Sequence, residues 1–229
     1  MMEIEVSAQQ RALGYELLAG IFLQEPSLDQ LAFLKKWASS LEDDLWLMRL
    51  LEQIEKNDPG LEELQQSYYD LFFVPVSGCF VPPFEAAIRG AKRQAGKKTK
   101  FGGFWGSWTL EVQSIYQKIG FEPNQLNIFE PLKEIKIPDH IGFELLALAS
   151  LCQVEEEYLK EKKDITPLRH YQRVLLVDHL NQWLDLFKKD LEQVDSTGYY
   201  TCFVQIAANF CREEAQSLLD TRIEDEVLI

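Results

Sequence analysis

Hydrophobic residues recur along most of the chain at spacings of three and four, which is the period of an amphipathic helix. No stretch sustains the alternation of apolar and polar residues that a half-buried strand requires. Ser7 and Ser27 are each followed three residues later by glutamine, as in a capping box, and so mark the beginnings of two helices. Two more helices are expected over residues 41–54 and from residue 61 onward, on either side of the turn at Asp58-Pro59-Gly60.

The rest of the chain is also predicted to be helical. Its apolar stripes predict a helix that ends at Gly120, one from Pro138 to about residue 163, one that begins at Thr166-Pro167, and one from Tyr199 to about residue 220. Residues 121–137 show little periodicity and are expected to form a linker. The sequence therefore predicts an all-α protein with an N-terminal helical subdomain over residues 1–134 and a C-terminal antiparallel helical bundle over residues 135–229.

One segment of the N-terminal part breaks the helical pattern. Residues 71–84 contain no charged side chain but include Pro75, Pro82 and Pro83. Prolines at these spacings exclude a continuous helix. Because loops are ordinarily polar and exposed, we expect residues 73–84 to form an irregular apolar loop that either packs over the core or lines a binding site.

Charge is distributed unevenly along the chain. There are 23 Lys and Arg against 37 Asp and Glu, which gives a net charge of −14. Residues 89–100 nevertheless hold six basic side chains, no acidic one and no apolar period. This basic loop is expected to be solvated and mobile. Trp105 and Trp108, which follow it, are expected in the core.

The acidic balance restricts the classes of partner. Nucleic acid and anionic membrane surfaces both require a basic face, so neither is expected as the main partner, whereas a cationic partner fits. No apolar stretch approaches the ~20 residues of a membrane span. Residues 1–5 do not resemble a secretory signal, and the four cysteines are too scattered for a disulfide framework. We therefore expect a cytoplasmic protein without stable membrane insertion.

No convincing catalytic or metal-binding motif is found in the sequence. The Glu-x-x-His pairs of a di-iron bundle are absent, and the cysteines lack the spacing of a zinc site. Gly96-Lys97-Lys98-Thr99 is similar to the end of a Walker A loop, but its distance from Gly90 is one residue too long and no strand precedes it. We expect no enzymatic activity, no cofactor and no metal. The alternative is a helical protein that binds or hydrolyses a nucleotide.

Five short motifs occur in an order that resembles a known family. They are Tyr68-Tyr69-Asp70-Leu71-Phe72, Pro82-Pro83-Phe84-Glu85, Asp139-His140-Ile141-Gly142 with Glu144, His179-Leu180 with Trp183 and Phe187, and Tyr199-Tyr200. Their order and spacing resemble the TorD/DmsD/NarJ family of redox-enzyme maturation chaperones over nearly the whole chain. This chain has Lys136 where the family pattern has an acidic residue, which leaves the identity of its client open.

The resemblance implies an all-helical, TorD-like protein without catalytic residues. Family members bind, in the cytoplasm, the twin-arginine signal peptide and the apo form of a molybdopterin oxidoreductase of the DMSO-reductase type; they aid cofactor insertion and prevent premature export. Some members are linked to guanine nucleotides. The resemblance leaves two oligomeric states open for this chain, a monomer and a domain-swapped dimer with residues 121–137 as the hinge. The ten residues carried over as contacts to the signal peptide or client are Tyr68, Leu71, Phe72, Pro82, Pro83, Phe84, Glu85, Asp139, His140 and Glu144.

The physical properties of the chain agree with such a ligand. A twin-arginine leader is a basic segment followed by an apolar one, so its receptor requires an apolar groove with acidic flanks. The uncharged loop and the acidic remainder of the chain supply both. Asp139 is expected to cap the helix that begins at Pro138. His140 is expected to be neutral and to hydrogen-bond the peptide backbone.

Overall fold

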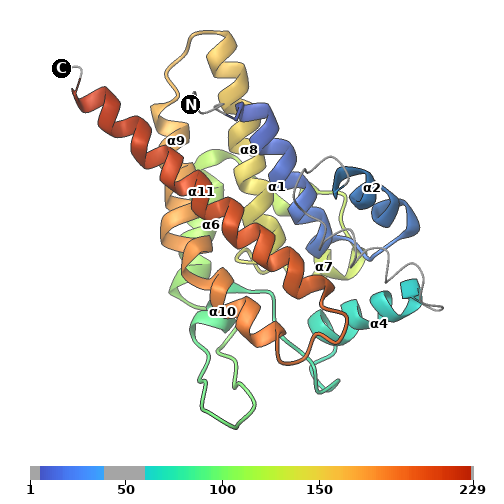
Figure 1. Cartoon of the computed structure of the whole chain (residues 1–229). Helices are drawn as coiled ribbons and strands as arrows, with labels where there is room; N and C mark the ends of the chain where they lie inside the picture. The colour runs from blue at the N-terminus through green and yellow to red at the C-terminus, as the bar shows by residue number, and fades with distance from the viewer. Residues whose placement is uncertain (1–5, 39–59, 228–229) are drawn as a thin grey trace.

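The computed structural model describes residues 6–38 and 60–227, and these residues form an assembly of helices (Figure 1). The β structure among them is limited to two isolated bridges, one between Phe84 and His140 and one between Lys92 and Lys100. The predicted all-α class is therefore confirmed. The helix predicted over residues 41–54 lies outside the described residues.

Within the described residues, the predicted helices occur in the expected order, but short helical elements also lie at residues 85–89 and within residues 121–137, which were expected to form a linker. The elements are α1 (Ala8–Leu23), α2 (Leu28–Ala38), α4 (Gly60–Phe72), α5 (Glu85–Arg89), α6 (Ser107–Ile119), η1 (Pro123–Gln125), α7 (Glu130–Ile135), α8 (Ile141–Lys160), α9 (Thr166–Arg173), η2 (Val174–Leu180), α10 (Asn181–Leu191) and α11 (Tyr199–Val227). Elements α9, η2 and α10 follow one another without a break, and η2 is π-helical. The sequence pattern predicts an ordinary α-helix at that place, so the π-helical segment is a difference from the prediction.

The core forms where α1 packs along α8, and α11 packs on α10 and reaches α1 (Figure 1). The close approach of α1 and α8 depends on Gly142, because a Cβ atom at that position would overlap the side chain of Leu23. Helix α1 belongs to the predicted N-terminal part and α8 to the C-terminal part, and one cluster of buried side chains includes both. The division at residue 134 stays a prediction.

Local sequence signals account for several helix ends. The Ser7 hydroxyl accepts a hydrogen bond from the Gln10 backbone N–H at 3.2 Å, and the Gln10 side chain accepts one from the Ser7 N–H at 2.9 Å. This is the predicted capping box. Gly120 ends α6 in the left-handed conformation, with φ of 69°, as its position predicts.

The apolar loop is irregular, as predicted, and changes from exposed to buried along its length. It begins directly after α4, and Val76 near its tip is 92% exposed. Toward its end Val81 is 2% exposed, and the Val81 N–H donates to the Leu71 carbonyl at 2.8 Å. The second half of the loop is therefore held against the core and leads directly into α5.

The basic loop is anchored, which the sequence does not predict. The backbones of Lys92 and Lys100 exchange two hydrogen bonds, of 2.8 and 3.1 Å, and so close a hairpin. Buried Asp190 of α10 accepts hydrogen bonds from Arg93, at 2.6 and 3.1 Å, and from the Thr99 hydroxyl at 3.0 Å. The segment is therefore attached to α10 through an acidic residue far along the sequence, and its mobility stays a prediction.

Candidate functional site

Two of the sequence motifs meet as neighbouring stretches of extended backbone. The Glu85 N–H donates to the Asp139 carbonyl at 2.9 Å, and the Ile141 N–H donates to the Pro83 carbonyl at 3.1 Å. This pairing places Phe84 opposite His140, with ring centroids 5.4 Å apart. It also explains why α8 begins three residues later than predicted: the residues before Ile141 pair with the start of α5 instead of continuing a helix.

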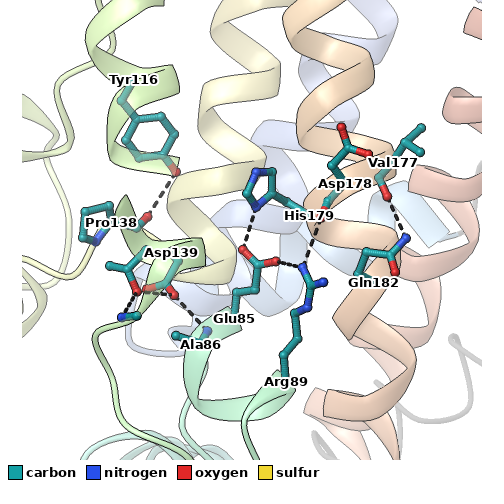
Figure 2. Close-up of polar contacts among 12 residues, drawn as sticks. Glu85, Ala86, Arg89, Tyr116, Pro138, Asp139, Val177, Asp178, His179 and Gln182 are labelled. Atoms are coloured by element: carbon teal, nitrogen blue, oxygen red, sulfur yellow. Dashed lines mark hydrogen bonds and ion pairs between the residues drawn. The ribbon is translucent and has the colours of Figure 1, made fainter. Parts of the chain in front are cut away.

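A third motif joins the first two through Glu85 (Figure 2). One oxygen of its carboxylate, Oε2, lies 2.8 Å from Nδ1 of His179, and the other, Oε1, accepts a hydrogen bond from Arg89 at 2.6 Å. The Glu85 side chain is fully buried. Burial of a carboxylate costs much free energy unless it has such partners. His179 and Arg89 therefore allow Glu85 to be buried here.

Arg89 bridges α5 to the π-helical segment. The same nitrogen, Nη1, also donates to the Asp178 carbonyl at 3.1 Å, and the guanidinium carbon lies 4.3 Å from the ring centre of Trp108. A second carbonyl of η2, that of Val177, accepts a hydrogen bond from the Gln182 side chain at 2.8 Å (Figure 2). Two carbonyls of the π-helical segment thus serve as acceptors for side chains. π-Helical segments occur frequently at functional sites.

Asp139 does not cap its own helix, and that prediction is wrong. Its Oδ2 atom accepts hydrogen bonds from the Ala86 N–H of α5 at 2.9 Å and from the Thr109 hydroxyl of α6 at 3.0 Å. Asp139 therefore joins two helices that precede it in the chain. Figure 2 shows its contact with Ala86. Burial raises the pKa of Asp139 to about 6, and the nearby charge of Glu85 adds to the increase.

His140 takes the local role that was expected of Asp139. It is the residue that caps α8, because its Nδ1 accepts a hydrogen bond from the Gly142 N–H at 3.1 Å. Burial lowers the pKa of His140 to about 3, so the imidazole is neutral, as predicted. An Nδ1 atom that accepts a hydrogen bond carries no proton, so the ring proton is on Nε2.

Glu144 lies one turn into α8 and is also fully buried. Both of its carboxyl oxygens lack a hydrogen-bond partner, and so does the indole N–H of Trp183, which lies close to this carboxyl. Burial raises the pKa of Glu144 well above its ordinary value, and the charges of Glu85 and Asp139 raise it further. Three buried carboxyl groups therefore lie near one another at this end of α8.

Three other candidate residues, Tyr68, Leu71 and Phe72, lie in the aromatic core. Tyr68 donates its hydroxyl hydrogen to the Phe22 carbonyl at 3.0 Å and stacks on Tyr200, with ring centroids 6.0 Å apart. Phe72 makes an edge-on contact with the same Tyr200 ring, at 4.8 Å. Together with Leu71, they hold the start of the apolar loop. All ten candidate residues are buried, and their role in binding a signal peptide or client stays a prediction.

Exposed aromatic side chains border the buried cluster. Trp105 is 56% exposed and Phe104 is 37% exposed. The Phe104 ring lies 5.4 Å from that of buried Phe84 and 6.4 Å from that of partly buried Phe80, which belongs to the apolar loop. We call Phe80, Phe104 and Trp105 the aromatic edge. The prediction that Trp105 belongs to the core is wrong, whereas Trp108 is partly buried beneath Arg89.

A cavity of about 430 Å³ lies beside the cluster, between α6, residues 120–138 and the first turn of α8. Tyr116 and Pro138 line it and connect it to the cluster, because the Tyr116 hydroxyl donates to the Pro138 carbonyl at 3.1 Å (Figure 2). Lys136 is also part of the lining and ends α7 in the left-handed conformation, with φ of 51°. The position that is acidic in the family pattern therefore contributes a cation to this cavity.

The sequence alone did not identify several residues of the site. Arg89, Trp108, Thr109 and Asp178 were not among the candidates, and His179 belonged to one of the five motifs but was not carried over as a contact. A local signal existed for one contact: Glu85 and Arg89 are four residues apart, the spacing at which a helix brings opposite charges together. The contacts from α6 and η2 have no such signal, because they join segments that are distant in the sequence.

Neither a metal centre nor a membrane span is found in the part of the chain that the structure describes. Among residues 6–38 and 60–227, no three His, Cys, Asp or Glu side chains are grouped so that they could hold a metal ion. No helix of the same residues is both long and apolar enough to cross a bilayer.

The chain is similar to assembly chaperones in two organisms. It is 39% identical over 64 residues to a chlorate reductase assembly chaperone protein of Ideonella dechloratans, and this match covers 28% of the chain and 33% of the relative. It is 41% identical over 59 residues to a selenate reductase assembly chaperone protein of Thauera selenatis, covering 26% of the chain and 31% of the relative. Each match thus spans about a third of the relative's length.

A solved structure and a family model also match. The structure, described as a redox enzyme maturation protein of Archaeoglobus fulgidus, has a TM-score of 0.48 and 18% identity, and covers 93% of this chain and 99% of its own. The family model for the nitrate reductase delta subunit matches residues 29–189, which include α5, the start of α8 and η2. That match covers most of the chain and confirms the resemblance to the TorD/DmsD/NarJ-type chaperones. The protein therefore belongs to the nitrate reductase delta subunit family.

Proposed function

We propose that this protein is a cytoplasmic chaperone for the assembly of a molybdopterin oxidoreductase of the DMSO-reductase type. Its ligand is the twin-arginine leader of the apo catalytic subunit. Binding holds that subunit until its cofactor is inserted and prevents earlier export. The two relatives, named as assembly chaperones of a chlorate reductase and a selenate reductase, support this class of client.

The observation that carries the proposal is the aromatic edge beside a buried group of carboxyls. Large aromatic side chains that stay exposed are frequent at the centres of protein interfaces, where they contribute most of the binding free energy. Phe104 and Trp105 offer such a surface to the apolar part of a leader. The net charge of −14 attracts its basic part.

The candidate residues support this edge from beneath. Phe84 packs against Phe104, and Asp139 connects the first turn of α5 to Thr109 at the beginning of α6. Helix α6 follows the aromatic edge directly, so these contacts fix its position. In this proposal, Phe84 and Asp139 act on the peptide indirectly, because they determine the shape of the surface that it contacts.

Calorimetry with a synthetic peptide tests the proposal. The peptide carries two consecutive arginines followed by an apolar segment. Trp105→Ala is expected to weaken its binding about tenfold, the loss typical of an aromatic anchor. Phe33→Ala is the matched control, because Phe33 of α2 is exposed to a similar extent, 58% against 56%. Equal effects of the two substitutions would exclude the aromatic edge as the binding surface.

Two further measurements test the ionic component and the client. Binding is expected to weaken as salt rises, and also when both arginines of the peptide are replaced by glutamine. In cells, the tagged protein is expected to capture an oxidoreductase that carries its leader and to lose it when the leader is deleted. Capture that is independent of the leader would contradict the proposed ligand.

A further inference from the structure

We propose that the groups around Arg89 form a binding site for a guanidinium, and that Arg89 occupies this site until an arginine of the client's leader replaces it. The inference rests on the proposed function and names the residues that recognise the arginine. It assigns to Arg89 the role of an internal competitor with the ligand.

The surroundings of Arg89 contain three kinds of group that a guanidinium prefers. They are the Glu85 carboxylate at 2.6 Å, the Asp178 carbonyl at 3.1 Å and the face of the Trp108 ring at 4.3 Å. Carboxylates and carbonyls accept guanidinium hydrogen bonds, and an aromatic face attracts the planar cation. The three groups come from α5, η2 and α6, so the fold itself assembles the site.

Arg89 is the residue of this cluster whose side chain is placed to move out into solvent. Its side chain is 21% exposed, whereas that of Glu85 is fully buried. Arg89 is the last residue of α5, a helix of five residues. Both of its hydrogen bonds use Nη1, which leaves its other nitrogens without a partner in the described structure. The hydrogen bonds of Arg89 thus involve a single nitrogen, and its other contact is the stacking of the guanidinium on Trp108.

An exchange of guanidinium groups avoids the usual cost of using a buried carboxylate as a receptor. Removal of one partner from a buried ion pair is strongly destabilising because a charge is left uncompensated. When an arginine of the ligand enters as Arg89 leaves, Glu85 retains a cationic partner, and Arg89 gains hydration. His179 holds the other oxygen of Glu85 throughout and keeps the carboxylate in position.

The location of the site fits the order of segments in a twin-arginine leader. Trp108, which forms the aromatic wall of the guanidinium site, lies in the first turn of α6, three residues after Trp105 of the aromatic edge. A peptide whose arginine reaches Glu85 therefore has an apolar surface next to it for the segment that follows. Lysine lacks the planar, stacking group that this site favours, so the site distinguishes arginine from lysine.

The test compares two synthetic leaders by calorimetry, one with twin arginines and one with twin lysines. Arg89→Met removes the competitor but keeps an apolar side chain of similar reach. It is expected to strengthen binding of the arginine peptide about threefold or more, and of the lysine peptide less. Glu85→Gln is expected to abolish most of the preference for arginine. Arg93→Met is the matched control, because Arg93 is 27% exposed and also pairs with a buried carboxylate, Asp190.

The outcomes separate this inference from the proposed function. The inference is wrong if folded Arg89→Met binds the arginine peptide no better than the wild type, or if Glu85→Gln keeps the full preference for arginine. If Arg89→Met does not fold, the test is made on the wild-type protein by ¹⁵N NMR. The side-chain N–H signal of Arg89 is expected to shift when the arginine peptide is added, and an unchanged signal would contradict the inference. Absence of binding by either peptide to the wild-type protein would instead contradict the proposed function.

Discussion

Glu85 and His179 lie 94 positions apart in the sequence, and a contact of 2.8 Å between Oε2 and Nδ1 joins their side chains. Both side chains are almost completely buried, at 0% and 2% exposure. The pair connects α5 to the π-helical segment η2, and the backbone pairing of residues 83–85 with 139–141 connects α5 to the start of α8. Three motifs that are separate in the sequence are therefore one unit in the fold.

The first prediction concerns this pair. His179→Ala leaves one oxygen of buried Glu85 without a partner, so the free energy of unfolding is expected to fall by about 2–4 kcal/mol. His179→Gln retains a donor and is expected to lose less. Urea denaturation measures both, with His170→Ala as the control, because His170 is exposed on α9. A loss of less than about 0.5 kcal/mol, as for a surface residue, would show that Glu85 does not depend on His179.

The second prediction concerns the capping of α5 by Asp139. Asp139→Ala deprives the Ala86 N–H and the Thr109 hydroxyl of their acceptor. It is expected to lower the free energy of unfolding by about 1–3 kcal/mol. A double-mutant cycle with Thr109→Val measures the coupling, which is expected to be at least about 0.5 kcal/mol. Additive effects of the two substitutions would contradict the contact between them.

The third prediction concerns pH. The pKa of His140 is about 3 in the folded protein, against 6.5 ordinarily. Between these two pH values, the imidazole binds a proton only when the chain is unfolded. Lowering the pH through this range therefore favours unfolding. His140→Asn keeps a capping acceptor but cannot titrate. Between pH 6.5 and 4, the wild type is expected to lose about 3 kcal/mol more stability than this variant. Stability curves that run parallel in this range would contradict the prediction.

Asp139 acts in the opposite direction over part of this range. Its pKa is raised from 3.8 to about 6, so between these values the folded state binds the proton and the unfolded state does not. Its contribution to stability therefore rises as the pH falls through about 6. The comparison of the wild type with His140→Asn removes this contribution, because both proteins retain Asp139.

The fourth prediction concerns the anchor of the basic loop. Asp190→Asn weakens the contacts with Arg93 and Thr99 that hold the hairpin to α10. Trypsin is therefore expected to cleave at the exposed lysines of the hairpin several times faster than in the wild type. Asp185→Asn, on the same helix, is the control, because Asp185 is exposed and pairs with exposed Arg212. Equal cleavage rates in the two variants would show that Asp190 is not the anchor.

The sequence predicted the features of the fold that depend on local signals. Hydrophobic spacing located the helices, Ser7 identified the beginning of α1, and Gly120 identified the end of α6. The π-helical segment could not be predicted in this way, because its residues keep an ordinary apolar pattern. The exchanged roles of Asp139 and His140 had no local signal either, since Asp139 bonds to Ala86 and Thr109, far from it in the sequence.

The candidate site shows the same limit. The motifs identified residues that the fold brings together, such as Phe84 with His140. Their burial could not be predicted, because a charged residue such as Glu85 is ordinarily exposed, and it is buried here only with partners from other helices. Exposure of Trp105 was likewise unexpected, since large aromatic residues are on average highly buried. Long-range packing decides both.

The last prediction concerns Glu144, whose carboxyl is buried without a hydrogen-bond partner and lies near two other acids. A buried polar group in that condition destabilises the fold. Glu144→Met replaces it with an apolar side chain of similar length. The variant is expected to unfold at higher urea concentration, with a gain of about 1 kcal/mol. Leu145→Met is the control on the same helix, because Leu145 is buried but carries no carboxyl.

Binding of the twin-arginine peptide distinguishes the reasons for such a costly residue. If Glu144 contributes to recognition, Glu144→Met is expected to be more stable than the wild type and to bind the peptide several times more weakly, the trade-off found at functional sites. A variant that is more stable and binds equally well would remove Glu144 from the candidate residues. A variant that is less stable than the wild type would show that the Glu144 carboxyl has hydrogen-bond partners in the folded protein. Its removal would then cost the free energy of those hydrogen bonds.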